Sequence, residues 1–463
     1  MMRLRFIFLL LFVALFLQHH YAQGSERTNI QGIGMARTSV AFSKGLDAVG
    51  INPAGVAANE DGTITLNFLP LGLHVGSDFL DYEIYTSYFT GEQTDSGRVP
   101  RYLTDGDKQR ILNGIGHDVA RTTVDAEAGL FGVSFHLKDI GGIAFTINER
   151  QNGYAAIPRD YAQFLLYGNP PGSVQNFGAT EMSASWMREY ALSFGFKLPA
   201  IRFLESLSIG AAAKLVHGYG FYSIDRFNAS LNTADNGTLH GHVDFLARSA
   251  GVDPYENGGF KTLKLFSKPA GRGYAFDFGL AGAVNNALSF GVALTDVGSI
   301  RWNSNASETV ADTTIEIDDP FAVEEGDAVK QALKGRKREV GSFKSELPTT
   351  MRIGVAVAVH KLPGFDKLNG LVVGLDLNKG FYETPGSTKK TRVSLGVEFL
   401  PIRWLPLRSG VSFGGTDHFN VAFGFGVHFG LFDLDVASEN VTWLFAPKTF
   451  SYGSVGIGMR FRI

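Results

Sequence analysis

The chain has 463 residues, no cysteine and a formal net charge of −3 at pH 7. This charge does not mark a nucleic-acid binder, and the lack of cysteine excludes disulfides, thiolate zinc sites and a lipid-modified N-terminal cysteine. The chain contains 56 Gly and 38 Phe, a bias that favours a β-barrel, and one large closed barrel can use this length in a single domain.

Residues 1–22 have the features of a secretory signal peptide. Arg3 and Arg5 precede the apolar run Phe6–Leu17, and a small residue, Ala22, offers a cleavage point. An uncleaved membrane anchor is the alternative, but the run is shorter than the roughly 20 apolar residues that span a bilayer. We therefore expect cleavage on export. Since no continuous apolar helix remains afterwards, an exported chain of apolar-faced strands points to the outer membrane of a Gram-negative cell.

Residues 23–60 do not have the pattern of a strand. They contain several glycines and a turn at Asn52-Pro53, where proline restricts φ and asparagine can bond nearby backbone. A flexible tail is the alternative reading. Apolar residues such as Met35, Phe42 and Leu46 disfavour it, so we expect a compact segment that packs against other backbone.

From residue 61 to residue 463 the dominant pattern is an alternation with period two. In Tyr274–Val284, large apolar residues alternate with Ala275, Asp277 and Gly279, and Leu288–Trp302 repeats the pattern after Asn285-Asn286. Side chains of a strand point to opposite faces in turn, so this is a hairpin with one apolar face, and asparagine suits a tight two-residue turn. The opposite face is small and weakly polar, which fits the lumen of a transmembrane barrel better than the surface of a soluble sandwich.

The same alternation predicts about 14 strands in all. Besides the hairpin, they are Thr63–Val75, Phe79–Phe89, Thr122–Leu137, Gly142–Arg150, Trp186–Leu198, Ser206–Ile224, Thr350–His360, Leu371–Lys379, Thr391–Leu400, Leu407–Gly414, Phe419–Phe429, Leu431–Ala437 and Phe450–Ile463. Short connections alternate with long polar ones, as expected for periplasmic turns and extracellular loops. Within the long connections, His242–Ala250 and Glu324–Arg338 are predicted to be partly helical.

The C-terminal strand alternates up to the last residue. The residues of its apolar face are Val455, Ile457, Met459, Phe461 and Ile463. A chain that ends inside a strand leaves an edge to be paired, and pairing it with the first strand closes a barrel. The pattern is similar to the C-terminal signal of outer-membrane barrels, which implies the barrel-assembly machinery as a partner.

Six charged or titratable residues lie on the small-residue face of the predicted strands. They are Asp277, Arg352, Asp376, Arg392, Glu398 and His428. They could line a polar pathway or anchor the N-terminal segment, or they could simply reflect the polar interior of any barrel.

Motifs of catalysis are absent from the sequence. It has no G-x-S-x-G elbow and no H-E-x-x-H helix, and His240-Gly-His242 lacks further ligands at a defined spacing. We therefore expect no enzyme activity, no cofactor and no metal site.

The N-terminal motifs resemble a known family. Gly32-Ile33-Gly34-Met35-Ala36, then Asp47-Ala48 and Asn52-Pro53-Ala54-Gly55, are similar to the start of the long-chain fatty-acid transporter family, the FadL-like barrels. The resemblance implies an all-β transmembrane antiparallel barrel of about 14 strands, with residues 23–60 as a plug in its lumen. It also implies that Asn52, Pro53, Ala54 and Gly55 form the plug turn. The stretch from Leu395 to Ser438 resembles the PorV-like subunits of a protein secretion system as well.

Two functions follow from these resemblances. The first is passive uptake of hydrophobic, fatty-acid-like small molecules, captured among the long loops and released when Asn52–Gly55 shifts. The second is a non-transporting adaptor that binds a protein through its extracellular loops. An aromatic and apolar cluster in Gln151–Ser185 suits either function, or simple packing of a loop on the rim; its members are Tyr154, Ile157, Tyr161, Phe164, Leu165, Leu166 and Tyr167. Outer-membrane lipid is an expected partner and nucleic acid is not.

Overall fold

The computed structural model describes residues 26–463 except 59–62, 80–81, 96, 116–118, 200, 252–267, 319–333, 366, 416–418 and 443–451. The predicted signal peptide, residues 1–22, therefore lies outside the described residues. Within the described part of the chain, no helix is both long enough and apolar enough to cross a membrane.

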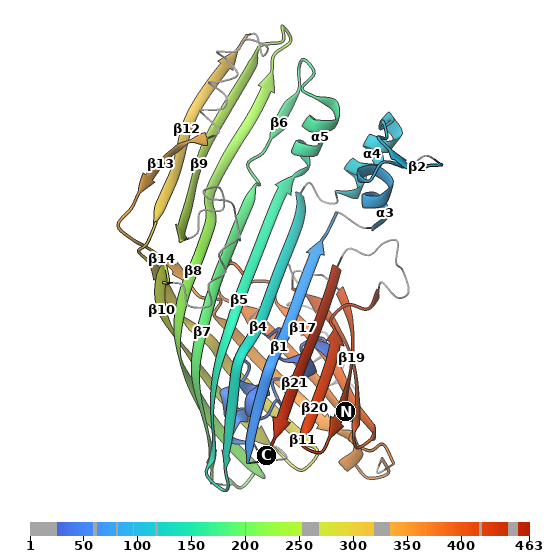
Figure 1. Ribbon diagram of the computed structural model, residues 1–463, viewed down its shortest axis with the longest axis vertical. Helices are drawn as coiled ribbons and strands as arrows, with labels where there is room; N and C mark the ends of the chain where they lie inside the picture. Colours follow the sequence, from blue (N-terminus) through green and yellow to red (C-terminus); the bar gives the residue numbers. More distant parts are fainter. Residues whose placement is uncertain are drawn as a thin grey trace, which may run out of the picture.

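Fourteen antiparallel strands form a closed ring (Figure 1), as the alternation predicted. In ring order they are β1 (Ile64–Ser77), β4 (Val119–Leu137), β5 (Gly141–Pro158), β7 (Glu181–Leu198), β8 (Ser206–Thr233), β10 (Gly271–Ala283), β11 (Leu288–Trp302), β15 (Thr350–Ala358), β16 (Val372–Gly380), β17 (Arg392–Ile402), β18 (Leu405–Gly414), β19 (Phe419–Phe429), β20 (Phe432–Ser438) and β21 (Tyr452–Arg462). β21 pairs with β1, and the backbone N–H of Ile463 donates to the Ile64 carbonyl at 2.8 Å. The last strand therefore closes the barrel.

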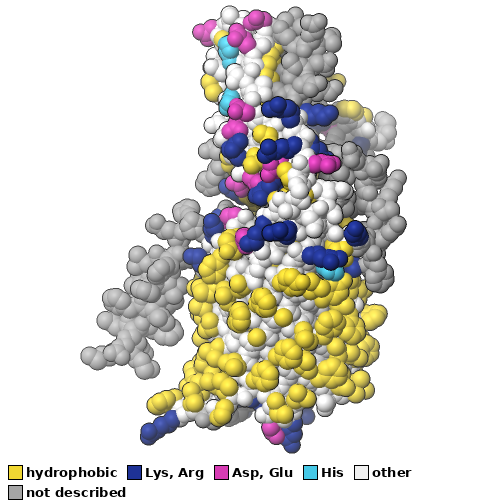
Figure 2. Space-filling view, turned by 90° about the vertical axis from the view of Figure 1, so that its left-hand side faces the viewer, with side chains coloured by type: hydrophobic (Ala, Val, Ile, Leu, Met, Phe, Trp, Pro, Cys, Tyr) yellow, Lys and Arg dark blue, Asp and Glu magenta, His cyan; other side chains and the backbone are white. Residues whose placement is uncertain are grey.

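The outer surface of the ring carries a belt of apolar side chains (Figure 2). Phe278, Leu375 and Phe423 remain 44–52% exposed, whereas their strand neighbours Asp277, Asp376 and Ala422 are at most 1% exposed. The period of two thus separates an exposed apolar face from a buried small or polar one. This is the arrangement that a barrel needs in order to face lipid outside and water or protein inside.

Replacing Phe423 with arginine is expected to lower the free energy of unfolding by about 2–4 kcal/mol, the cost of a cation at the lipid-facing midplane of a barrel. Reversible denaturant unfolding of the barrel in lipid vesicles measures this change. Thr313→Arg is the matched control, because Thr313 is exposed on β12 (Ser307–Ile317), which is outside the barrel ring. Equal unfolding free energies for the two variants would contradict the lipid-facing assignment of Phe423.

Two predicted elements are wrong. Phe79–Phe89 is not a strand: Tyr82–Ile84 (α3) is α-helical and Tyr85–Phe89 (η3) is a π-helix. Asp78 ends the sheet there, since its N–H donates to the Arg121 carbonyl at 3.0 Å and its carboxylate accepts the Arg121 N–H at 2.5 Å. β4 then pairs with β1 in place of the predicted hairpin partner.

The segment His242–Ala250 is not helical but lies in the strand β9 (Leu239–Gly251). The reason is tertiary, because β8 runs for 28 residues and its upper part offers an edge that β9 pairs with. Of the second predicted helical stretch, Glu324–Arg338, residues 324–333 lie outside the described residues, and the last three residues belong to the strand β13 (Arg336–Glu339).

The Asn285-Asn286 connection is wider than a two-residue turn. Neither asparagine has a positive φ. Instead, the Asn285 side-chain oxygen accepts the backbone N–H groups of Ala287 and Leu288 at 2.9 and 2.8 Å. The side chain thus supplies the local bonds that a tighter turn would have made with backbone.

A tall extension continues the wall at the end with the long loops (Figure 1). It contains the upper part of β8 with β6 (Val174–Asn176), β9, β12 and β13, and α5 (Arg159–Tyr167) lies beside it; β14 (Phe343–Glu346) pairs with β11 at its base. Two further helices and a small hairpin precede β4: α3, α4 (Asp105–Gly114), β2 (Glu92–Thr94) and β3 (Gly97–Val99). Trp302 anchors the base of the extension, where it is completely buried against Phe221 and Phe343.

The N-terminal segment, residues 26–58, lies inside the ring of strands (Figure 1). It contains α2 (Ile30–Gly34) and two short 3₁₀-helices, η1 (Gly45–Ala48) and η2 (Pro53–Ala57). Met35, Ala36, Ala48 and Ala54 have no exposed surface. The segment therefore belongs to the core of the barrel.

Candidate functional site: the N-terminal segment against the barrel wall

The wall approaches the N-terminal segment where its strands carry glycine. A Cβ atom placed on Gly72, Gly142, Gly195, Gly210, Gly279, Gly291 or Gly410 would lie 2.1–2.5 Å from an atom of the segment. These glycines belong to seven different strands, β1, β5, β7, β8, β10, β11 and β18. Glycine is needed at each because an added side chain would overlap the segment, whose nearest atom is the Asn52 side-chain oxygen at Gly279 and a backbone atom at the other six positions.

Asn52, Pro53, Ala54 and Gly55 are all buried between the segment and the wall. The Asn52 side-chain oxygen caps η2 by accepting the Ala54 N–H at 3.2 Å. Its amide nitrogen donates to the carbonyls of Val40 and of Leu280, at 3.2 and 3.1 Å. One side chain therefore joins η2, another part of the segment and strand β10.

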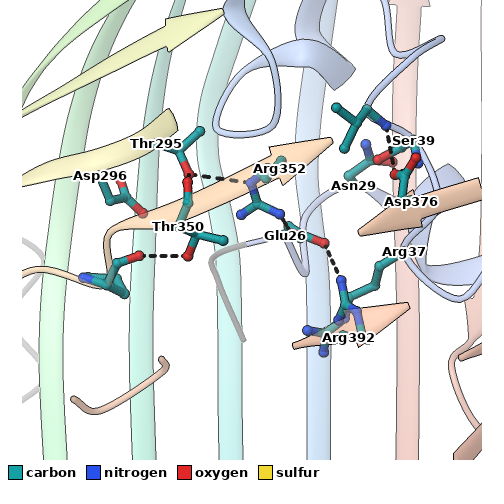
Figure 3. A network of polar contacts seen from close by, with 12 residues as sticks. Glu26, Asn29, Arg37, Ser39, Thr295, Asp296, Thr350, Arg352, Asp376 and Arg392 are labelled. Atoms are coloured by element: carbon teal, nitrogen blue, oxygen red, sulfur yellow. Dashed lines mark hydrogen bonds and ion pairs between the residues drawn. The ribbon is translucent and has the colours of Figure 1, made fainter. Parts of the chain in front are cut away.

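A network of buried ion pairs joins the segment to the wall (Figure 3). Glu439 pairs with Arg37 at 2.6 Å, with Arg27 at 3.0 Å and with Arg392 at 3.9 Å. Glu26 pairs with Arg352 and, at 3.3 Å, with Arg392. All of these side chains are at most 5% exposed. Because a charge removed from water is stable only when it is paired, each residue depends on its partners.

Four of the six predicted lumen residues contact the N-terminal segment. Arg352 and Arg392 do so through Glu26, as described above. The Asp376 carboxylate accepts the backbone N–H groups of Ser39 and Val40 at 2.6 and 2.9 Å. Glu398 accepts a hydrogen bond from Gln31 at 2.9 Å. Their role in anchoring or transport stays a prediction.

The other two predicted residues pair within the wall. His428 lies 3.2 Å from Asp435. Asp277 pairs with Lys214 at 2.8 Å. It also accepts the Asp296 N–H at 2.7 Å, where Asp296 has a φ of +57° and the β10–β11 register shifts.

Several charged residues of these networks were not predicted. The most important are Glu26, Arg27, Arg37, Glu439, Arg150, Lys214 and Asp296. Arg150 and Lys214 lie on the small-residue face of their predicted strands, so their positions in the alternation could have identified them as lumen residues. Arg27 and Arg37 lie in a segment that was expected to be buried, where any charge requires a partner.

A cavity of about 300 Å³ lies in the barrel beside the N-terminal segment. It is lined by β4, β5, β7, β8 and the loop after β16: Arg121, Thr123, Asp125, Gly153, Tyr154, Glu181, Met182, Ser183, Ser223, Ile224, Asp225, Glu383, Thr384, Gly386, Ser387 and Thr388. Asp125 connects the cavity to the segment, because it pairs with Arg27 at 2.9 Å and accepts a hydrogen bond from Asn152 at 2.7 Å.

The loop of residues 381–391, called the strap here, reaches from β16 to the far wall. Gly386 lies so close to the Asn152 side chain of β5 that a Cβ atom would be 2.7 Å from it. β5 and β16 are nearly opposite each other in the ring of strands. The strap, Asn152, Asp125 and Arg27 therefore form one chain of contacts between the long-loop end and the N-terminal segment. Among the residues that the structure describes, no group of three or more His, Cys, Asp or Glu side chains could hold a metal ion.

The fold and this interface define a closed β-barrel with an apolar outer belt and a lumen occupied by its own N-terminal segment. The model of a family of unknown function (DUF5723) matches residues 53–439, and the chain belongs to this family. Among curated proteins, none matches the sequence.

Several solved barrels are similar in overall structure at low sequence identity. A Pseudomonas aeruginosa FadL homologue is 12% identical with a TM-score of 0.49, and the match covers 95% of this chain and 99% of that one. The Ralstonia pickettii toluene transporter TbuX is 10% identical with a TM-score of 0.48, over 95% and 99% of the two chains. The CymD monoaromatic hydrocarbon channel is 11% identical with a TM-score of 0.45, over 95% and 97%.

Proposed function

We propose that this protein is an outer-membrane β-barrel for the passive, gated uptake of small hydrophobic or amphipathic molecules, and that it is related to the FadL-like family. The observation that carries the proposal is the cavity, because Asp125 of its lining forms an ion pair with Arg27 of the N-terminal segment. An open diffusion pore would need a clear lumen, whereas the segment here contacts many wall strands. A cavity beside a filled lumen favours stepwise passage, in which a ligand binds before the segment moves.

In this scheme the ligand enters from the long-loop end and rests in the cavity. Binding disturbs the hydrogen bond from Asn152 to Asp125 and the ion pair between Asp125 and Arg27. Loss of that ion pair would weaken the hold of the wall on the first residues of the segment. The signal peptide of residues 1–22 would direct the chain to the outer membrane, and Val455–Ile463 would serve the assembly machinery.

The surface around α5 supports the adaptor function less strongly than the cavity supports uptake. Tyr161 packs on Phe177 with ring centroids 4.4 Å apart, and the Tyr167 hydroxyl accepts a hydrogen bond from Gln109 of α4 at 3.0 Å. Tyr154 lines the cavity instead. In the cluster that a protein partner was expected to bind, Leu165 is 79% exposed and Ile157 is 43% exposed. Part of the cluster therefore packs within the molecule, and part of it, Ile157, Leu165 and Tyr167, remains exposed.

Mass spectrometry of organic extracts from the purified barrel tests the proposal. We expect a stoichiometric hydrophobic compound that is absent from an unrelated barrel prepared in the same detergent. The double variant Asn52→Ala, Pro53→Ala should lose the compound, because the bonds from Asn52 to Val40 and Leu280 hold the segment in place. Asn232→Ala is the control, since Asn232 is exposed on the extension. Finding only the bulk lipids of the unrelated barrel would overturn uptake and favour a search for a protein partner.

A further inference from the structure

The cavity has an excess of negative charge. It is lined by four carboxylates, Asp125, Glu181, Asp225 and Glu383, and one guanidinium, that of Arg121. Three of these five groups are neutralised by neighbours: Asp125 pairs with Arg27, Asp225 with Arg248, and Arg121 with Asp78. In the part of the chain that the structure describes, neither Glu181 nor Glu383 forms an ion pair. One oxygen of Glu383 accepts hydrogen bonds from the Thr388 hydroxyl and the Lys389 backbone N–H, each at 3.0 Å, but neither donor is a charged group. Two carboxylates without a cationic partner are therefore left to act on a ligand.

These two carboxylates come from different sides of the cavity. Glu181 begins β7, whereas Glu383 lies on the strap. Both line the same cavity as the aromatic ring of Tyr154. An aromatic face attracts a cation, and two nearby carboxylates add to this attraction. The same arrangement repels an anion.

The remaining lining suits a small amphipathic molecule. Met182 and Ile224 add apolar surface beside Tyr154, and Met182 is 41% exposed. Thr123 and Ser387 are 8% and 6% exposed. Their hydroxyls have no hydrogen-bond partner among the described residues. A volume of about 300 Å³ is at the lower end of the range for small-molecule sites. The cavity thus combines an apolar wall, unpartnered hydroxyls and uncompensated carboxylates.

We propose that the cavity selects small amphipathic molecules that carry a protonated amine and discriminates against those that carry a carboxylate. This inference rests on the proposed function and narrows it, because it excludes a fatty acid as the preferred ligand. The ammonium would lie between Glu181 and Glu383, with its hydrocarbon part on Tyr154, Met182 and Ile224.

Three ligands that differ only in the head group test the inference: 2-phenylethylamine, 2-phenylethanol and phenylacetate. Their binding to the purified full-length barrel is measured by calorimetry at low and high salt. We expect the amine to bind about tenfold more tightly than the carboxylate, as the sum of several exposed charge interactions. High salt should reduce this ratio, since it screens solvent-exposed charges.

The double variant Glu181→Gln, Glu383→Gln should bring the ratio of amine to carboxylate affinity close to one without changing the affinity for 2-phenylethanol. The control is Glu316→Gln, Glu339→Gln, which removes the same charge from exposed positions on β12 and β13. Equal or tighter binding of phenylacetate, or a ratio that survives the double variant, would overturn the inference, and binding of 2-phenylethanol would still support uptake. Binding of none of the three would overturn the cavity as a ligand site, while the extraction experiment would judge uptake separately.

Discussion

Replacing Glu439 with glutamine is expected to release the N-terminal segment from the wall while the barrel stays folded. Glu439 is 1% exposed and is the carboxylate shared by Arg27, Arg37 and Arg392. Removing one partner of a buried ion pair costs about 3–5 kcal/mol, because the remaining charges are left unpaired. At about 1.4 kcal/mol for each factor of ten, the bound state of the segment should weaken at least a hundredfold.

Trypsin measures this release directly, since it cleaves after arginine. Arg27 and Arg37 are 4% and 1% exposed, so the wild-type segment should resist cleavage there. The Glu439→Gln variant should be cut at both sites and should keep the heat-modifiable electrophoretic mobility of a folded barrel. Glu308→Gln is the control, because Glu308 pairs with Arg338 at an exposed site where an ion pair contributes only about 0–1 kcal/mol. Equal protection of all three proteins would show that Glu439 does not hold the segment.

Replacing Gly210 with valine should open the lumen by a steric route. A Cβ atom at Gly210 would lie 2.2 Å from the Pro53 carbonyl carbon and 2.3 Å from the Ala54 nitrogen. Both are backbone atoms of η2, so no side-chain rotation can relieve the overlap, whereas valine itself suits a β-strand. We therefore expect the strand to remain and η2 to move away. Ion conductance across planar bilayers should rise from near zero to the level of an open channel.

A second glycine on the same strand provides the control. At Gly220 the nearest atom to an added Cβ is the Trp186 Cβ, 4.0 Å away, which is an ordinary contact. Gly220→Val should therefore leave conductance at the wild-type level. A closed lumen in Gly210→Val, with the barrel folded, would mean that the wall bends outward to accommodate valine and that the close contact with η2 does not control the pore.

The six predicted lumen residues show how much of the site can be predicted from the sequence. Period-two alternation identified Arg352, Arg392 and Asp376 as inward-facing because parity alone decides which face a side chain takes. Parity says nothing about the partner across the lumen. Glu26 lies 366 positions from Arg392, and Arg27 lies 412 positions from Glu439. Only closure of the ring brings these groups together.

The sequence by itself determined the class of fold, the approximate number of barrel strands and the apolar belt, since each depends on a local alternation of large and small side chains. It also indicated that residues 23–60 are too apolar for a solvated tail. The tertiary structure decided where the local pattern does not predict the element. At Phe79–Phe89 the sheet ends at Asp78, and at His242–Ala250 the chain pairs as a strand with the edge of the long strand β8. It also decided the pairing of the buried charges and the shape of the cavity. Both depend on contacts between strands that are distant in sequence, which no local pattern encodes.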